Sequence, residues 1–129
     1  MPSVSPYLLY NDVDAMLDWL TRAFGLTERT RMRMPGGDDK AVHAEMECGD
    51  GLVMMGCPGP DYRNPKSLGA ATVLLFVNVD DVDAHFARAQ AAGAEIVTGL
   101  ENKPYGRTYA AKDPEGHQWH FAKPPAGSE

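Results

Sequence analysis

The sequence has few cysteines and no long apolar run. Its two cysteines, Cys48 and Cys57, stand apart without a C-x-x-C partner, which excludes a disulfide-rich scaffold and a cysteine-based zinc module. No charged and then apolar leader opens the chain, so we expect a cytoplasmic protein. The apolar stretch 71–79 stops at Asp80 after nine residues, about half of the ~20 that a membrane-spanning helix needs. We therefore expect no membrane partner.

Basic side chains are also in short supply. Lysine and arginine number 12 against 18 aspartates and glutamates, which leaves a net charge of −6. Such a surface repels phosphate backbones and weakly attracts cations, so nucleic acid is not expected as a partner. A length of 129 residues fits one domain, 1–129, which would bury roughly two thirds of its unfolded surface without disulfide or metal support.

The chain contains an internal repeat. The tetrapeptide Asp-Val-Asp-Ala at 12–15 recurs at 81–84, 69 residues later. In both copies an apolar run precedes Asn and Asp residues whose side chains can cap a helix. Apolar residues then recur at helical spacing, and a glycine follows, Gly25 in the first copy and Gly93 in the second. The repeat predicts two helices with one apolar face each, and each of them must pack on a sheet.

Strand-like segments follow each helix, separated by turn residues. They cover 26–34, 40–48 and 52–56 in the first copy, and 94–100, 107–112 and 117–122 in the second. Each copy therefore has the pattern β-α-β-β-β. We place module one at about 3–57 and module two at about 71–124. The segment 57–70 between them is rich in proline and glycine, so we expect a linker without a regular element.

Three features carry a resemblance to a known family. The doubled pattern, the opening "LLYNDVDA" with "LDWLTRAFGL", and the closing "YGRTYAAKDPEGHQWHFAKP" resemble the vicinal oxygen chelate superfamily. This superfamily includes glyoxalase I, bleomycin-resistance proteins, fosfomycin-resistance enzymes and extradiol dioxygenases. The resemblance implies an α+β fold, the glyoxalase/bleomycin-resistance fold, in which two tandem β-α-β-β-β modules form a curved mixed sheet around a cavity. It also implies a homodimer, because two subunits of these proteins frequently share the cavity.

The metalloenzymes of that superfamily hold an ion at four inward positions, one in the first strand and one in the last strand of each module. The matching residues here are Ser5 and Leu74 in the first strands, and Met55 and His120 in the last strands. Only His120 is a usual ligand of a divalent metal, and such sites need several ligands. We therefore expect no metal and no other cofactor.

The segment 40–48 leaves an alternative open. Its alternation places His43 and Glu45 on one strand face, which could look into the cavity near His120. These side chains would suit a metal site of unusual geometry, or a general acid/base pair in which Glu45 works with His43 or His120. An exposed polar strand face accounts for the same pattern.

The two histidines near the C-terminus are not expected to bind one ion together. The sequence "DPEG" at 113–116 is typical of a type I turn in a hairpin. On the strand that follows, alternation puts His117 and His120 on opposite faces. Trp119 and Phe121 share the face of His117, and we expect them to pack beneath a helix.

The predicted cavity has an apolar wall with scattered polar groups, as small-molecule sites require. Its apolar residues are Tyr7, Leu9, Val53, Met55, Leu74 and Phe76. Its polar residues are Ser5, His43, Glu45, Asn78, Gln118 and His120. Tyr105 and Arg107 in "KPYGRTY" match a pattern common among uncharacterised members of the family and are candidates for the mouth of the cavity. A surface loop is an equally good place for Arg107.

These features favour a binding protein over an enzyme. We expect a metal-free, small-molecule binding protein like the bleomycin-resistance members, which sequesters an apolar or aromatic compound and thereby confers antibiotic resistance. One alternative is a metal-dependent lyase or isomerase related to glyoxalase I, against which the missing ligands count. Another is a metal-free acid/base enzyme that uses Glu45 and His120.

Overall fold

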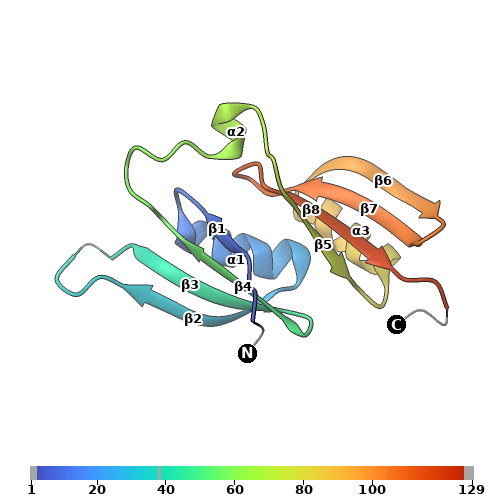
Figure 1. Cartoon of the computed structure of the whole chain (residues 1–129), viewed down its shortest axis with the longest axis horizontal. Coiled ribbons are helices and arrows are strands. Elements are labelled where there is room, and N and C mark those ends of the chain that lie inside the picture. The colour runs from blue at the N-terminus through green and yellow to red at the C-terminus, as the bar shows by residue number, and fades with distance from the viewer. Residues whose placement is uncertain (1–2, 38, 127–129) are drawn as a thin grey trace.

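The computed structural model describes residues 3–37 and 39–126. Module one contains β1 (Tyr7–Leu9), α1 (Val13–Phe24), β2 (Thr27–Arg33), β3 (Ala41–Cys48) and β4 (Gly51–Gly56). Module two contains β5 (Leu74–Asn78), α3 (Val82–Ala91), β6 (Glu95–Lys103), β7 (Gly106–Lys112) and β8 (Gln118–Lys123). Both modules have the predicted order β-α-β-β-β (Figure 1). Among the described residues, no helix has the length and apolar character needed to cross a membrane.

Each module forms one four-stranded mixed sheet. The strand orders are β1-β4-β3-β2 and β5-β8-β7-β6, so the first and last strands of a module lie side by side. These two strands pair in parallel, and all other neighbours pair antiparallel. The helices α1 and α3 contact each other behind the sheets in the view of Figure 1. The predicted α+β fold is confirmed, although the two sheets stay separate and are not closed into one.

Both long helices begin at the repeated Asp-Val-Asp-Ala sequence. Asp12 caps α1 by accepting a hydrogen bond from the backbone N–H of Ala15, and Asp81 caps α3 through Ala84 in the same way, each at 3.0 Å. Such a cap satisfies a backbone donor that the helix itself leaves free. α1 ends at Gly25, whose φ of 74° is the left-handed conformation that glycine adopts most easily.

The linker contains a regular element that we did not expect. A one-turn helix, α2 (Pro65–Leu68), interrupts it. Asn64 caps this turn by accepting from the backbone N–H of Ser67 at 2.9 Å, and Pro65 supplies a φ suited to a first helical position. The prediction of a linker without structure was wrong, because the proline and glycine taken as breakers act here as the start and stop signals of a short helix.

The core lies between the helices and the inner faces of the sheets. α1 supplies a broad apolar stripe to it, consisting of Val13, Met16, Leu17, Trp19, Leu20, Ala23 and Phe24. Trp119 and Phe121 of β8 are fully buried against it, as the alternation along that strand predicted. Phe24 contacts both rings, with centroid separations of 5.4 and 4.8 Å. The end of α1 is therefore packed on module two as well as on its own sheet.

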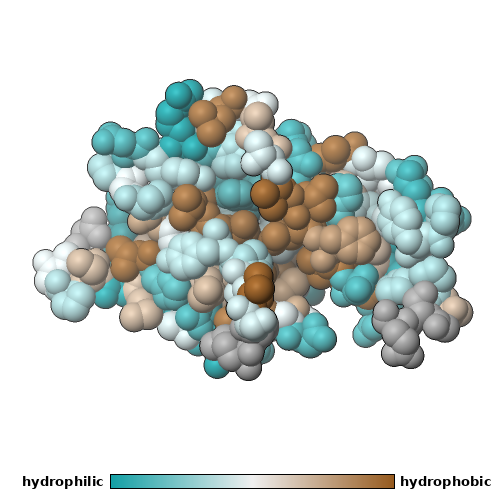
Figure 2. Space-filling view, in the orientation of Figure 1, coloured by the Kyte–Doolittle hydropathy of each residue, from teal (hydrophilic) through white to brown (hydrophobic). Residues whose placement is uncertain are grey.

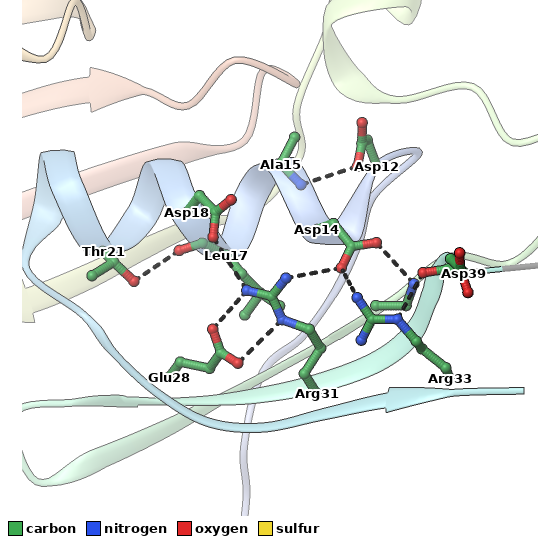
Figure 3. A network of polar contacts seen from close by, with 11 residues as sticks. Asp12, Asp14, Ala15, Leu17, Asp18, Thr21, Glu28, Arg31, Arg33 and Asp39 are labelled. Atoms are coloured by element: carbon green, nitrogen blue, oxygen red, sulfur yellow. Dashed lines mark hydrogen bonds and ion pairs between the residues drawn. The ribbon is translucent and has the colours of Figure 1, made fainter.

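A network of charged side chains fixes the outer strands of module one to α1 (Figure 3). Asp14 accepts hydrogen bonds from Arg31 at 3.0 Å, from Arg33 at 3.1 Å and from the backbone N–H of Ala41 at 2.9 Å. The bond from Ala41 and the two guanidinium groups lower the pKa of Asp14. Arg31 also contacts Asp18 on α1 and Glu28 on β2. This network lies on the side of the sheet that faces α1.

Module two holds the start of α1 through the turn 113–116. The Glu115 carboxylate accepts from the backbone N–H groups of Asn11 at 2.6 Å and Asp12 at 2.9 Å. The buried Asp113 carboxylate accepts from the Tyr10 hydroxyl at 2.6 Å. Its position is set within module two by Trp119, whose indole N–H donates to it at 3.1 Å. The turn is formed as predicted, with Gly116 N–H on the Asp113 carbonyl, but its acidic residues also join the modules.

Side chains of α3 hold the other end of α1. The last carbonyls of a helix have no partner within it, and three of those of α1 find one on α3. Arg88 donates to the Thr21 and Arg22 carbonyls, both at 2.9 Å. His85 Nε2 lies 2.9 Å from the Phe24 carbonyl, which as an acceptor requires the proton on that nitrogen. Because module two holds α1 at both ends, the relative placement of the two sheets is determined by the chain itself.

Candidate functional site

The face of each sheet that is turned away from the helices carries exposed apolar side chains. We call these two surfaces the open faces of sheet one (β1-β4-β3-β2) and sheet two (β5-β8-β7-β6). Tyr7 is 46% exposed, Leu74 44% and Phe76 51%. Figure 2 shows apolar side chains gathered over the middle of this side of the molecule, between the two sheets. A contiguous patch of exposed apolar side chains is a candidate binding surface.

The residue of β4 predicted to face the cavity is one position away from the residue that does so in the structure. Met55 and Val53 were expected to line the cavity. Met55 is completely buried in the core, whereas Val53 is nearly completely buried but still borders the groove between the modules that is described below. Met54 takes the expected place, because it pairs with Tyr7 on one side and with Glu45 on the other. In both modules the cavity-facing residue of the last strand was predicted to be the fourth one after the turn glycine. β4 begins on Gly51 itself, whereas β8 begins two residues after its turn glycine.

Three polar side chains form a line across the open face of sheet one. The Tyr7 hydroxyl lies 2.8 Å from His43 Nδ1, and His43 Nε2 lies 3.1 Å from the Glu45 carboxylate. The side chains of His43 and Glu45 are 24% and 23% exposed, so protein shields most of their surface. Sequence alternation had placed His43 and Glu45 on one face, but it could not show that Tyr7 joins them.

The open face of sheet two is largely apolar around a single imidazole. β5 contributes Leu74, Phe76 and Asn78 to it, and the pairing register places Phe76 beside His120. Within the described residues the His120 imidazole makes no hydrogen bond. The Tyr105 ring reaches this face from the β6–β7 turn, with its centroid 6.3 Å from that of Phe76.

Gln118 and Leu74 form the neighbouring pair on this face, in register with Lys112 of β7. Gln118 also lines a smaller pocket of about 340 Å³, together with Lys66 of α2 and Lys112. Gln118 therefore lies at the end of the sheet that faces the linker.

Arg107 does not reach the open face. Its guanidinium contacts the Asp83 carboxylate of α3 through two nitrogens, at 2.7 and 3.4 Å, and Asn102 at 3.1 Å. The hydrogen bond that Arg107 donates to Asp83 raises the pKa of Arg107. The side chain therefore lies on the helix side of β7, and of the pair expected at the cavity mouth only Tyr105 is on the apolar side.

The residues at the family's metal positions do not fit a metal ion within one chain. The corrected set is Ser5, Met54, Leu74 and His120, which offers one imidazole and no carboxylate. His43 and Glu45 belong to the other sheet from His120 and pair with each other. Among residues 3–37 and 39–126, no three His, Cys, Asp or Glu side chains converge as metal ligands do. The alternative of an ion held by His43, Glu45 and His120 has no support in this arrangement.

A groove of about 960 Å³ runs between the two modules. Module one lines it with the segment before β1, including Ser5, and with the β3–β4 hairpin. Module two lines it with β5, including Phe76 and Asn78, and with His85 of α3. The groove thus collects four of the residues expected in the cavity, Ser5, Val53, Phe76 and Asn78, while Tyr7, His43 and Glu45 lie on the open face of sheet one outside it.

The buried Asp113 and the half-buried His85 lie at the joint between the modules, and neither was singled out from the sequence. Burial raises the pKa of Asp113, although its hydrogen bonds from Tyr10 and Trp119 oppose the shift. Burial likewise lowers the pKa of His85. A type I turn alone accounts for an aspartate at position 113, so the sequence carries no separate signal for its role at the joint.

The geometry of the two modules agrees with comparisons to known proteins. The sequence profile of the Glyoxalase/Bleomycin resistance protein/Dioxygenase superfamily matches residues 4–121. The chain belongs to this superfamily. An uncharacterized protein of Mycobacterium tuberculosis (strain ATCC 25618 / H37Rv) is 37% identical to it over 129 residues, which cover 95% of this chain and 75% of that protein.

Solved structures of the superfamily fold resemble this chain over nearly its whole length. TioX from Micromonospora sp. ML1 is 37% identical, with a TM-score of 0.77 over 95% of this chain and 98% of TioX. The bleomycin-binding protein from bleomycin-producing Streptomyces verticillus, solved with copper(II)-bleomycin, is 21% identical, with a TM-score of 0.67 over 95% of this chain and 97% of that protein. At that identity the second likeness concerns the fold alone. Membership of the superfamily, expected from the sequence, is confirmed.

Proposed function

We propose that this chain is a small-molecule binding protein of the glyoxalase/bleomycin-resistance type, which sequesters an apolar or aromatic compound without a metal. The observation that carries the proposal is the set of exposed apolar side chains on the two open faces, Tyr7, Leu9, Leu74, Phe76 and Tyr105. Apolar surface supplies affinity, and a few polar groups supply orientation. A protein of this fold, the bleomycin-binding protein of Streptomyces verticillus, was solved in complex with copper(II)-bleomycin.

The proposal includes a homodimer in which the open faces of two subunits together enclose the ligand. Each sheet is covered by a helix on one face only, and the exposed apolar side chains lie on the other. A second copy of the chain would remove this surface from water, at about 25 cal/mol for each Å². Analytical ultracentrifugation at micromolar concentration should show a dimer, and a monomer alone would contradict this part of the proposal.

Binding itself is tested by calorimetry with a panel of aromatic antibiotics and quinones. We expect a negative heat-capacity change, the marker of apolar burial. Phe76→Asp should abolish the signal while the protein stays folded, because Phe76 lies on the open face. A matched control is Val97→Asp, which changes an exposed residue of β6 outside the groove. No heat signal with any compound would overturn the proposal.

The remaining parts of the proposal concern the site's chemistry and the protein's setting. Elemental analysis after dialysis should find far less than one divalent ion per chain, because three of the four family positions hold Ser, Met and Leu. One tightly held zinc, nickel, manganese or iron per subunit would favour the lyase alternative. We also place the protein in the cytoplasm, where its free cysteines, Cys48 and Cys57, would stay reduced. A role in resistance would follow if the ligand is a toxic compound.

A further inference from the structure

The line of Tyr7, His43 and Glu45 crosses three strands and depends on a glycine. Tyr7 is on β1 and His43 is on β3, and β4 lies between them in the sheet. At the crossing point β4 carries Gly56, which pairs with His43. A Cβ atom at Gly56 would lie 2.5 Å from the Tyr7 hydroxyl and 3.1 Å from its ring. The tyrosine can reach His43 because this position has no side chain.

The hydrogen bonds within the line have a direction when His43 is neutral. The Glu45 carboxylate only accepts, so His43 Nε2 carries the proton that joins them at 3.1 Å. His43 Nδ1 then holds a lone pair and accepts the Tyr7 hydroxyl proton at 2.8 Å. Because the Tyr7 hydroxyl donates its proton to His43, its oxygen can only accept a hydrogen bond from a further partner. It offers that lone pair beside the apolar side chains of the open face.

We propose that Tyr7, His43 and Glu45 form a relay that binds the hydroxyl group of a phenolic or enolic ligand and takes up its proton. This inference rests on the proposed binding function and specifies the ligand class. The ligand O–H bond breaks as its proton passes to the Tyr7 oxygen. The Tyr7 proton moves at the same time to His43 Nδ1, and the resulting imidazolium is stabilised by Glu45. The ligand remains bound as an anion through the Tyr7 hydroxyl, so no other reactant is needed.

The surroundings of the relay favour this proton transfer. The residues that face His43 and Glu45 from the adjacent strands are uncharged: Thr30 and Met32 on β2, and Met54 and Gly56 on β4. Among the described residues, no lysine or arginine forms an ion pair with the Glu45 carboxylate, and the two methionines add apolar surface beside it. Glu47 is the next carboxylate of β3 on this face, and it is exposed. An ion pair of imidazolium and carboxylate, together with a bound anion, is stabilised more strongly here than in water.

The test uses two chromophoric probes that differ only in the transferable proton. 4-Nitrophenol reports its ionisation by a visible absorption band, and 4-nitroanisole has the same ring with a methyl ether. At a pH where free nitrophenol is mainly neutral, wild-type protein should raise the ratio of anion to neutral probe roughly tenfold, which corresponds to one pKa unit. Tyr7→Phe and Glu45→Gln should remove this spectral change. Tyr7→Phe should also weaken phenol binding by about tenfold while changing ether binding by less than about twofold.

The controls separate this inference from the proposed function. Tyr62→Phe removes a hydroxyl of the linker, away from the open faces, and should leave both the spectrum and the affinities unchanged. Circular dichroism should show that Tyr7→Phe is folded. If the ether binds but the bound phenol stays neutral, or if the anion band persists in Tyr7→Phe, the relay is overturned and the binding function stands. If neither probe binds, both are overturned.

Discussion

Residues that pair side by side across the four strands form a row, and the equivalent rows on the open faces of the two sheets differ in chemical character. In sheet one the row is Tyr7, Met54, Glu45 and Thr30. In sheet two the row in the same register is Phe76, His120, Ala110 and Thr98. The tyrosine that can accept a proton is replaced by a phenylalanine, and the carboxylate by a methyl group. The repeated module therefore presents a polar line on one open face and an aromatic, largely apolar surface on the other.

The helices of the two modules differ in a complementary way. α1 buries seven side chains, whereas α3 buries only Val82 and Ala89. α3 instead carries His85 and Arg88, which bind the last carbonyls of α1. Module one thus supplies most of the core, and module two supplies the polar contacts that hold it. The same topology can serve both tasks because it fixes the positions of the strands and helices but not which side chains they carry.

The largest effect should come from breaking the joint at the start of α1. Asp113→Ala removes the acceptor of Tyr10, of Trp119 and of two backbone N–H groups. Buried donors left without a partner are costly, so we expect the free energy of unfolding in urea to fall by about 4 kcal/mol. The matched control is Asp50→Ala in the corresponding β3–β4 turn of module one, where the residue is exposed. A change of about 0.5 kcal/mol or less is expected there.

A second pair of variants tests the corrected face of β4. Met55→Ala should lower the free energy of unfolding by about 3 kcal/mol, because it leaves a cavity in the core. Met54→Ala, one residue earlier on the open face, should cost less than about 1 kcal/mol. Chemical denaturation of the two variants measures both values. Equal losses would mean that β4 is buried on both faces and that sheet one has no open face.

The burial of His85 at the joint between the modules should make stability depend on pH. The folded protein disfavours a charged His85, because burial lowers its pKa from the ordinary value of 6.5. Below about pH 6.5 the unfolded chain binds a proton at His85 more readily than the folded protein does. The free energy of unfolding therefore decreases as the pH is lowered, by at most about 1.4 kcal/mol per pH unit. His85→Gln should show a weaker decline in urea titrations, and His120→Gln should follow wild type. The same slope in all three proteins would exclude His85 as its source.

The smallest effect concerns the other half of that joint. Arg88→Ala removes two hydrogen bonds to the carbonyls of Thr21 and Arg22, which water can replace at this exposed site. We expect a loss of about 1 kcal/mol in thermal or chemical unfolding. Arg29→Ala, which removes an exposed arginine of β2, is the control and should be neutral. A larger loss for Arg29 would show that charge balance, and not the helix end, determines the effect.

The sequence alone determined the elements and their order. The Asp-Val-Asp-Ala repeat located both long helices, since capping side chains and a glycine stop act within a few residues. Strict alternation likewise predicted that Trp119 and Phe121 are buried. These signals are local, and they do not depend on what the chain later packs against. The sequence of α2, Asn64 to Gly69, contained the same kind of signal, although its proline was taken as a breaker.

Only the tertiary structure decided which side chains meet. The run 51–56 is apolar throughout, so it has no alternation from which its buried face could be predicted, and its pairing with Tyr7 and Glu45 settled the matter in favour of Met54. His43 joins a tyrosine 36 residues away because β4 carries a glycine between them. Arg107 lies toward Asp83, and not toward a ligand, because α3 crosses its side of β7. Such contacts depend on register and on neighbouring strands, which residue patterns along one chain do not encode.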